Sequence, residues 1–144
     1  MKNKSIRIRS GNTSGSIQHY YHFLLGYLLP LIHWLYVEKN ILNYETIYVD
    51  DPKLLKKLLK DIFPTNVKFF SNDINSKFLI TETIYGYDQR NNYPINLIKE
   101  STEELKNLIS KSKTFDKDHD NYNSKKTKSI LIINRGKPHE FYNS

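Results

Sequence analysis

Three histidines stand in a long uncharged stretch of the chain and are its first candidates for chemistry. Between Arg9 and Glu38 no residue carries a formal charge, yet His19, His22 and His33 interrupt the apolar residues. An imidazole exchanges protons near neutral pH and can bind a metal ion. His33 lies about three helical turns beyond His22, too far to close one metal site with the other two histidines. His22 is therefore the candidate catalytic residue, with a hydrogen-bonded core histidine as the alternative.

A second candidate site follows the apolar run 129–133 near the end of the sequence. Asn134, Arg135 and Lys137 come directly after this run, which is typical of a central parallel strand. Open α/β sheets bind ligands at the carboxyl ends of their strands. Guanidinium and ammonium groups at such a place suit the oxygens of a diphosphate. These three residues are predicted to bind substrate, and an ordinary polar turn is the alternative.

Three further motifs carry weaker signals. The loop Gly11-x-x-x-Gly15 precedes a helix and could hold a phosphate there, but it lacks the lysine of a P-loop. The acidic stretch 116–121 lacks the glycine and the glutamate that a calcium loop requires, so it is expected to be a solvated linker. The pair Asp50-Asp51 is explained by helix capping. No metal or other cofactor is predicted.

The elements that must position His22 begin with a helix over residues 16–37. Its polar positions share one face because they recur at spacings of three and four residues: Gln18, His22, Gly26, Pro30 and His33. We expect a buried helix with a polar seam, bent or broken at Pro30. A membrane span preceded by basic residues is an alternative, and the lack of a suitable cleavage site disfavours a secretory signal.

Strand and helix patterns alternate along the rest of the chain. Strands are predicted at 6–9, 45–49, 67–70 and 129–133, and residues 78–85 are predicted to form one strand or two short ones. After Asp50-Asp51-Pro52 a helix is expected, with one apolar face formed by Leu54, Leu55, Leu58, Leu59 and Ile62. A capping box at 101–104 predicts the start of the last helix. This order favours a single α/β domain with an open sheet.

Composition limits the classes of function. The chain has 144 residues, no cysteine and a net charge of +7. It has no disulfide framework, thiol nucleophile or thiolate metal site. Four lysines cluster on one predicted helix, at 53, 56, 57 and 60, and are interpreted as its solvated face. A nucleic-acid partner is therefore not predicted, and a cytoplasmic location is the simplest expectation.

Two segments resemble glycosyltransferase family 61, whose bacterial and viral members are often called capsular polysaccharide biosynthesis proteins. The first is Tyr20-Tyr-His22-Phe-Leu-Leu25 followed by Leu28-Leu-Pro30-Leu, which is similar to the family's "HFLL…LP" helix. The second is the strand 130–133 followed by Asn134-Arg135-Gly136, which is similar to a later family strand. The resemblance covers most of this chain but only the first half of a family member.

The resemblance implies a GT-B enzyme that transfers a sugar from a nucleotide-sugar donor to a glycan or other hydroxyl acceptor, usually without a bound metal. It implies that His22 lies at the active cleft and that Arg135 faces the donor phosphates. Residues 1–112 would form a Rossmann-like acceptor-side domain, 113–128 a linker, and 129–144 the first strand and loop of a truncated second domain. A second polypeptide or a dimer would then complete the fold.

Two other functions remain open from the sequence. One is a non-catalytic, truncated α/β domain that binds a partner through the edge of its last strand. The other is a membrane-associated protein anchored through residues 20–37, or a cytoplasmic one in peripheral contact with a membrane. The donor sugar, the acceptor and the linkage are not encoded in any recognisable motif.

Overall fold

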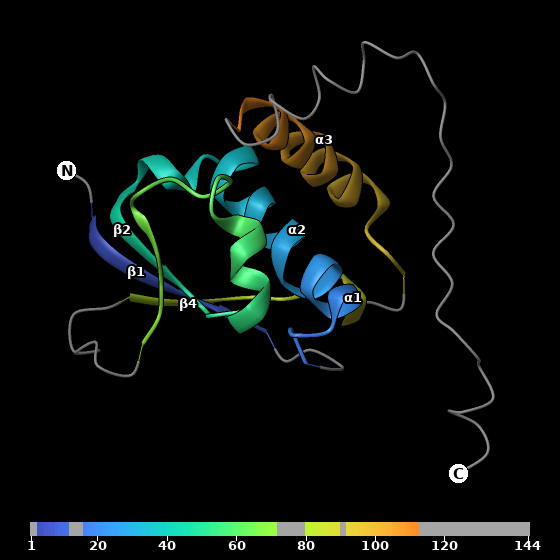
Figure 1. Ribbon diagram of the computed structural model, residues 1–144, viewed down its shortest axis with the longest axis horizontal. Coiled ribbons are helices and arrows are strands. Elements are labelled where there is room, and N and C mark those ends of the chain that lie inside the picture. The colour runs from blue at the N-terminus through green and yellow to red at the C-terminus, as the bar shows by residue number, and fades with distance from the viewer. Residues whose placement is uncertain (1–2, 12–15, 72–79, 90–91, 113–144) are drawn as a thin grey trace.

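The computed structural model describes residues 3–11, 16–71, 80–89 and 92–112, which form one α/β unit (Figure 1). The predicted linker 113–128 and the predicted strand 129–133 lie outside the described residues. So does the acidic stretch 116–121.

Four parallel strands form the sheet. They are β1 (Asn3–Ser10), β2 (Tyr44–Val49), β3 (Val67–Phe69) and β4 (Ile80–Ile84), in the order β3-β2-β1-β4. The first four predicted strands are thereby confirmed, as is the α/β class. A small parallel sheet with helices is compatible with a Rossmann-like open sheet.

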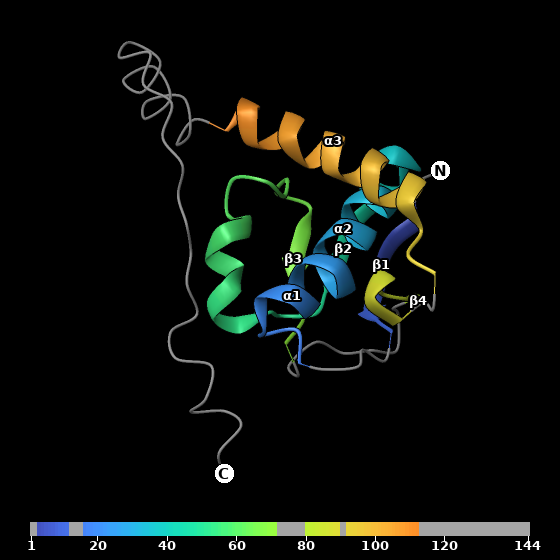
Figure 2. The same cartoon turned by 90° about the vertical axis from the view of Figure 1, so that its right-hand side faces the viewer.

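Apolar and polar side chains alternate along the central strand β1, so that one face of the sheet packs against the core. Ile6 and Ile8 are buried in β1, whereas Arg9 is exposed on the other face. Ile6 pairs with Ile47 of β2, so their side chains share a face. The helical segments pack against this apolar face, as Figures 1 and 2 show.

The central helical element runs without interruption from Tyr20 to Val37. It consists of α1 (Tyr20–Phe23), the π-helical turn η1 (Leu24–Leu28), α2 (Leu29–Ile32) and a second π-helical turn η2 (His33–Val37). Of the bend or break expected at Pro30, the break is wrong because the helix continues through this residue. Proline lacks an N–H and in an α-helix its ring clashes with the carbonyl four residues earlier, here that of Gly26. The wider π-helical turn just before Pro30 gives that ring room.

This helix supplies most of the hydrophobic core. Its fully or nearly fully buried side chains include Phe23, Leu31, Ile32 and Leu35. The prediction of a buried helix is confirmed over residues 20–37, whereas the predicted first residues, 16–19, precede the helix. Within the described residues, no helix has the length and apolar character required to cross a bilayer.

The last helix, α3 (Ile95–Lys111), packs against α2 and η2 (Figure 2). His33 contributes to this contact because its Nε2 lies 3.0 Å from Oε2 of Glu100. The predicted helix start at 101–104 is wrong. Ser101 is fully buried in the middle of α3, and its hydroxyl donates to the carbonyl of Leu97 one turn earlier, as serine does inside helices.

The segment after β2 also differs from its prediction. It forms a 3-10 helix, η4 (Lys53–Leu59), in which Asp51 accepts a hydrogen bond from the Lys53 N–H at 2.7 Å. A 3-10 helix has three residues per turn, so leucines spaced for an α-helix do not share a face. Leu59 is buried, whereas Leu54 is 80% and Leu58 is 54% exposed. Two shorter 3-10 turns are η3 (Asn40–Leu42) and η6 (Tyr87–Gln89).

Replacing Leu35 by alanine is expected to lower the free energy of unfolding by about 2–5 kcal/mol, because it opens a cavity at a fully buried position. The matched control is Leu42→Ala, at a side chain that is 61% exposed. Urea titration of both variants measures the difference. Equal losses in the two variants would contradict the assignment of residues 20–37 to the core.

Candidate functional site

The site lies where the strand order of the sheet reverses. The chain proceeds outward from β1 to β2 and β3, and then returns to place β4 on the opposite side of β1. In open α/β sheets, ligands bind at such a reversal, outside the carboxyl ends of the strands. Here the segments that follow β1 and β4 meet at that edge: α1 carries His22, and η6 carries Asp88.

A hydrogen bond joins these two side chains. Nδ1 of His22 lies 2.7 Å from Oδ2 of Asp88, and the Asp88 side chain is completely buried while that of His22 is 22% exposed. An ionised Asp88 carboxylate can only accept a hydrogen bond, and in that pairing Nδ1 of His22 is the donor. In the neutral ring, Nε2 then holds the free lone pair. This is the tautomer of an imidazole that can act as a general base.

The Asp88 carboxylate is held by a close approach of two backbone segments. A Cβ on Gly86 would lie 2.4 Å from Oδ1 of Asp88 and 2.7 Å from the Cα of Gly26. A Cβ on Gly26 would lie 3.1 Å from both Asp88 oxygens. The two glycines thus let the loop after β4 touch the π-helical turn of the central helix. On the polar face of the helix, Gly26 leaves room for the Asp88 carboxylate and His22 forms a hydrogen bond with it.

Because Asp88 is buried, its hydrogen bond to His22 contributes to the stability of the fold. Its second oxygen, Oδ1, is buried without a hydrogen-bond partner among the described residues. A buried carboxylate is costly unless it is paired. His22 is the partner that offsets this cost, and the pairing fixes the orientation of the imidazole ring.

Exposed tyrosines surround the accessible side of His22. An open hollow of about 780 Å³ is lined by His19, Tyr20, Tyr21 and His22, together with Leu24 and Leu25. The Tyr21 ring meets the His22 ring edge-on at 5.3 Å, and its hydroxyl lies 2.5 Å from that of Tyr93. This hydrogen bond raises the pKa of Tyr21, so Tyr21 stays protonated at neutral pH. The tyrosines offer both apolar ring faces and hydroxyl groups to a ligand.

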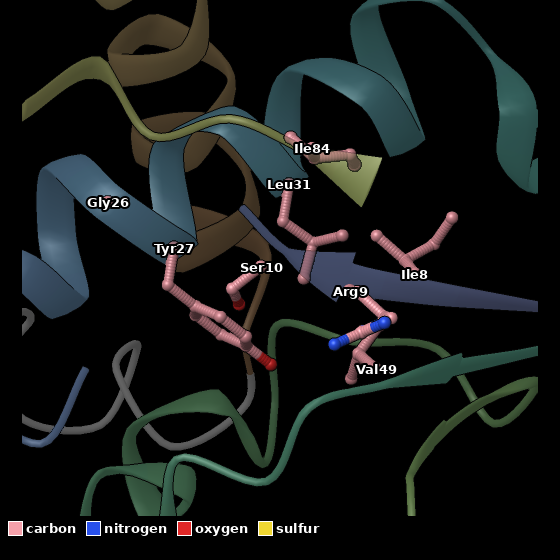
Figure 3. A pocket seen from close by; sticks show the side chains of 8 residues that line it. All are labelled: Ile8, Arg9, Ser10, Gly26, Tyr27, Leu31, Val49 and Ile84. Atoms are coloured by element: carbon pink, nitrogen blue, oxygen red, sulfur yellow. The ribbon is translucent and has the colours of Figure 1, made fainter. Parts of the chain in front are cut away.

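A second, much smaller cavity lies between the helix and the ends of β1, β2 and β4 (Figure 3). It measures about 10 Å³ and is lined by residues such as Ser10, Gly26 and Tyr27. This space is at the lower limit for one water molecule and holds no larger ligand. Burial raises the pKa of the Tyr27 hydroxyl, which donates to the backbone carbonyl of Asp50 at 2.8 Å. The cavity is therefore part of the packing beside the site.

Asp50 and Asp51 have structural partners. Asp50 accepts the Ser10 N–H at 2.8 Å and lies 3.6 Å from the Arg7 guanidinium. Asp51 accepts the Lys53 N–H and pairs with Lys56. Within the described ranges, no group of three or more histidine, cysteine or acidic residues could hold a metal ion. The capping prediction is wrong for Asp50, whose partners lie on β1, and Asp51 bonds to the first residue of η4 while Pro52 stands at the N-cap without a side-chain capping bond.

The other predicted site residues divide into two groups. His19 shares the hollow with His22, whereas His33 bonds to α3 and plays no part at this edge. Asn134, Arg135 and Lys137 lie outside the described residues, so their predicted contact with a diphosphate stays a prediction. The phosphate loop predicted at 11–15 is described only at Gly11, whose N–H donates to the Ile84 carbonyl.

Sequence reasoning missed Asp88. The signal was present, because Gly86-Tyr-Asp88 follows a predicted strand as directly as Asn134-Arg135 follows the run 129–133. The rule that ligands bind at carboxyl ends of strands applies equally to both segments. The sequence does not reveal that Asp88 pairs with His22, since the two residues are 66 positions apart in the chain.

The sequence matches no protein-family model, and neither a curated protein nor a solved structure matches this chain.

Replacing Gly86 by alanine is expected to disrupt the His22–Asp88 pair. The added methyl group collides with the Gly26 backbone as well as with the carboxylate, and such overpacking costs about 1–3 kcal/mol of stability. The readout is the low-field proton resonance of His22 Nδ1–H, which we expect to be present in the wild type and lost in the variant. A variant that keeps both this resonance and its stability would contradict the described packing.

Proposed function

We propose that this chain is the acceptor-side part of a glycosyltransferase, in which His22 activates an acceptor hydroxyl. The observation that carries the proposal is the His22–Asp88 pair at the sheet's reversal point, beside an open hollow bordered by tyrosines. The "HFLL…LP" resemblance supports the same residue. The fold class is compatible with the first domain of a GT-B enzyme of glycosyltransferase family 61.

The geometry suits the deprotonation of an alcohol. A sugar hydroxyl in the hollow would donate its proton to Nε2 of His22, while Asp88 stabilises the imidazolium that forms. No hydrogen bond joins Nε2 to another residue of the described part, so this atom is available to a substrate. The apolar faces of a sugar ring match the exposed rings of Tyr20 and Tyr21, which are 65% and 45% exposed.

The transfer step balances without a further reactant. The acceptor oxygen attacks the anomeric carbon of a nucleotide sugar and its proton passes to His22. The bond between that carbon and the diphosphate breaks, and the nucleoside diphosphate leaves with the electron pair. Cations aligned with the departing phosphates lower the barrier. Arg135 and Lys137 are proposed for that role, with Asn134 as a further donor of hydrogen bonds.

His22→Ala is expected to lower kcat by about 10²–10⁴-fold, because it removes the general base. Asp88→Asn should also lower kcat, because a neutral amide stabilises the imidazolium poorly. The matched control is His33→Ala, which changes a histidine of the same helix outside the site. The assay measures nucleoside diphosphate released from a panel of nucleotide sugars, with and without oligosaccharide acceptors.

Two outcomes of this assay would overturn the proposed function. Turnover that is equal in wild type and His22→Ala would remove His22 from the reaction. A folded chain that releases no nucleoside diphosphate from any donor would leave the alternative, a non-catalytic α/β domain that acts through a partner.

The donor side has a separate test. Calorimetric titration with nucleoside diphosphates is expected to show saturable binding that falls at least tenfold in Arg135→Ala, because a guanidinium pairs strongly with phosphate oxygens. Lys126→Ala is the matched control, since it also removes one positive charge from the same part of the chain. Equal weakening by both variants would show that only net charge matters and would remove Arg135 from the donor site.

A further inference from the structure

A second hollow adjoins the one that contains His22. It measures about 280 Å³ and is lined by the first half of the central helix, by η4 and by the second half of α3, which are visible together in Figure 2. Tyr20 and Leu24 belong to the lining of both hollows. We call the space at His22 the histidine hollow and its neighbour the apolar hollow. Because the two spaces share a wall, one ligand can occupy both.

The apolar hollow is hydrophobic and open to solvent. Its walls include Leu28 of the central helix, Leu58 of η4 and Ile109 of α3. Leu58 is 54% exposed and Tyr20 is 65% exposed, so water reaches these walls. A ligand that covers them removes apolar surface from water, which favours binding.

Few polar side chains face this hollow. Apart from the Tyr20 hydroxyl, those of its described lining residues are Asp61 and Ser112. Asp61 is exposed, so its carboxylate stays hydrated. A sugar placed here would leave hydroxyl groups without hydrogen-bond partners, which is costly, whereas a hydrocarbon chain needs none.

The 3-10 geometry of η4 presents one leucine to the apolar hollow. With three residues per turn, Leu54, Leu58 and Leu59 point to three different sides of the helix. Leu59 is buried, Leu58 lines the hollow, and Leu54 is 80% exposed and lies outside the lining. The same helix therefore provides both a binding residue and a matched control.

We propose that the apolar hollow binds the hydrocarbon aglycone of an amphipathic acceptor, whose sugar lies in the histidine hollow. This inference rests on the proposed function, which places the acceptor sugar at His22. The change in polarity occurs at Tyr20, whose ring offers an apolar face and whose hydroxyl can bond to a sugar. At roughly 30 Å³ for a group the size of water, such as a methylene, the hollow holds about nine groups.

The first test needs no variant and no turnover. The full chain is titrated calorimetrically with methyl, butyl, hexyl, octyl and decyl β-glucosides, all below the concentrations at which they form micelles. The dissociation constant is expected to fall by about twofold to fourfold per added methylene, because a fully buried methylene contributes about fourfold. The gain should level off at about eight or nine carbons, since the hollow has a finite volume.

Variants on two elements locate the chain in the apolar hollow. Leu58→Ser and Ile109→Ser are each expected to weaken octyl glucoside binding about tenfold, because each removes apolar contact area. The matched controls are Leu54→Ser on η4 and Ile95→Ser on α3, at side chains that are 80% and 63% exposed and lie outside the lining. These controls should bind like the wild type. Thermal unfolding verifies that each variant is folded.

A third measurement tests the connection between the two hollows. Octyl glucoside is expected to shift the ring resonances of His22, whereas octanol should bind more weakly and leave them unchanged. Such a difference requires that the sugar and the hydrocarbon chain of one ligand lie on opposite sides of Tyr20.

Four results would overturn the inference. They are equal affinity for methyl and octyl glucoside, equal weakening by the control variants, octyl glucoside binding without a shift at His22, and self-association of the chain that Leu58→Ser abolishes. The last would assign the hollow to a second copy. Failure of the proposed function has a different signature: no nucleoside diphosphate is released although the dependence on chain length persists, and the two hollows then remain a glycoside-binding site.

Discussion

Burial of the helix from Tyr20 to Val37 is the constraint on which this fold depends. The sheet supplies isoleucines and valines to one side of the helix, and α3 packs against its second half. Ile32 and Leu35 are completely buried as a result. A helix enclosed in this way can carry polar groups only where another element meets them, because an unpaired buried polar group is costly.

The polar seam of the helix meets such partners at two places. His22 and Gly26 face the loop after β4, where they receive Asp88, and His33 faces α3, where it receives Glu100. The two places have different consequences. The His33 contact is partly exposed and joins two helices, whereas the His22 contact buries a carboxylate at the edge where α/β sheets bind ligands.

The first π-helical turn of the central helix shapes the candidate site. Gly26 lies within this turn, and Leu29 donates its N–H to the carbonyl of Leu24, five residues earlier. The wider turn accommodates Pro30 and brings a glycine against Asp88. Single π-helical turns within helices occur frequently at functional sites, and here the turn forms one wall of the candidate site.

The sequence by itself determined the class of the fold, the four strands of the described residues and the burial of the central helix, because hydrophobic periodicity is a local signal. It also singled out His22 as a candidate, as one of three histidines in an otherwise apolar, uncharged stretch. Local signals did not determine helix geometry: η4 is a 3-10 helix that exposes Leu54 and Leu58, and Ser101 lies inside α3 rather than at its start. Only the tertiary structure brought Asp88 to His22. Their contact depends on the order of strands in the sheet and on two glycines from distant segments, and no pattern of spacing along the chain encodes such an approach.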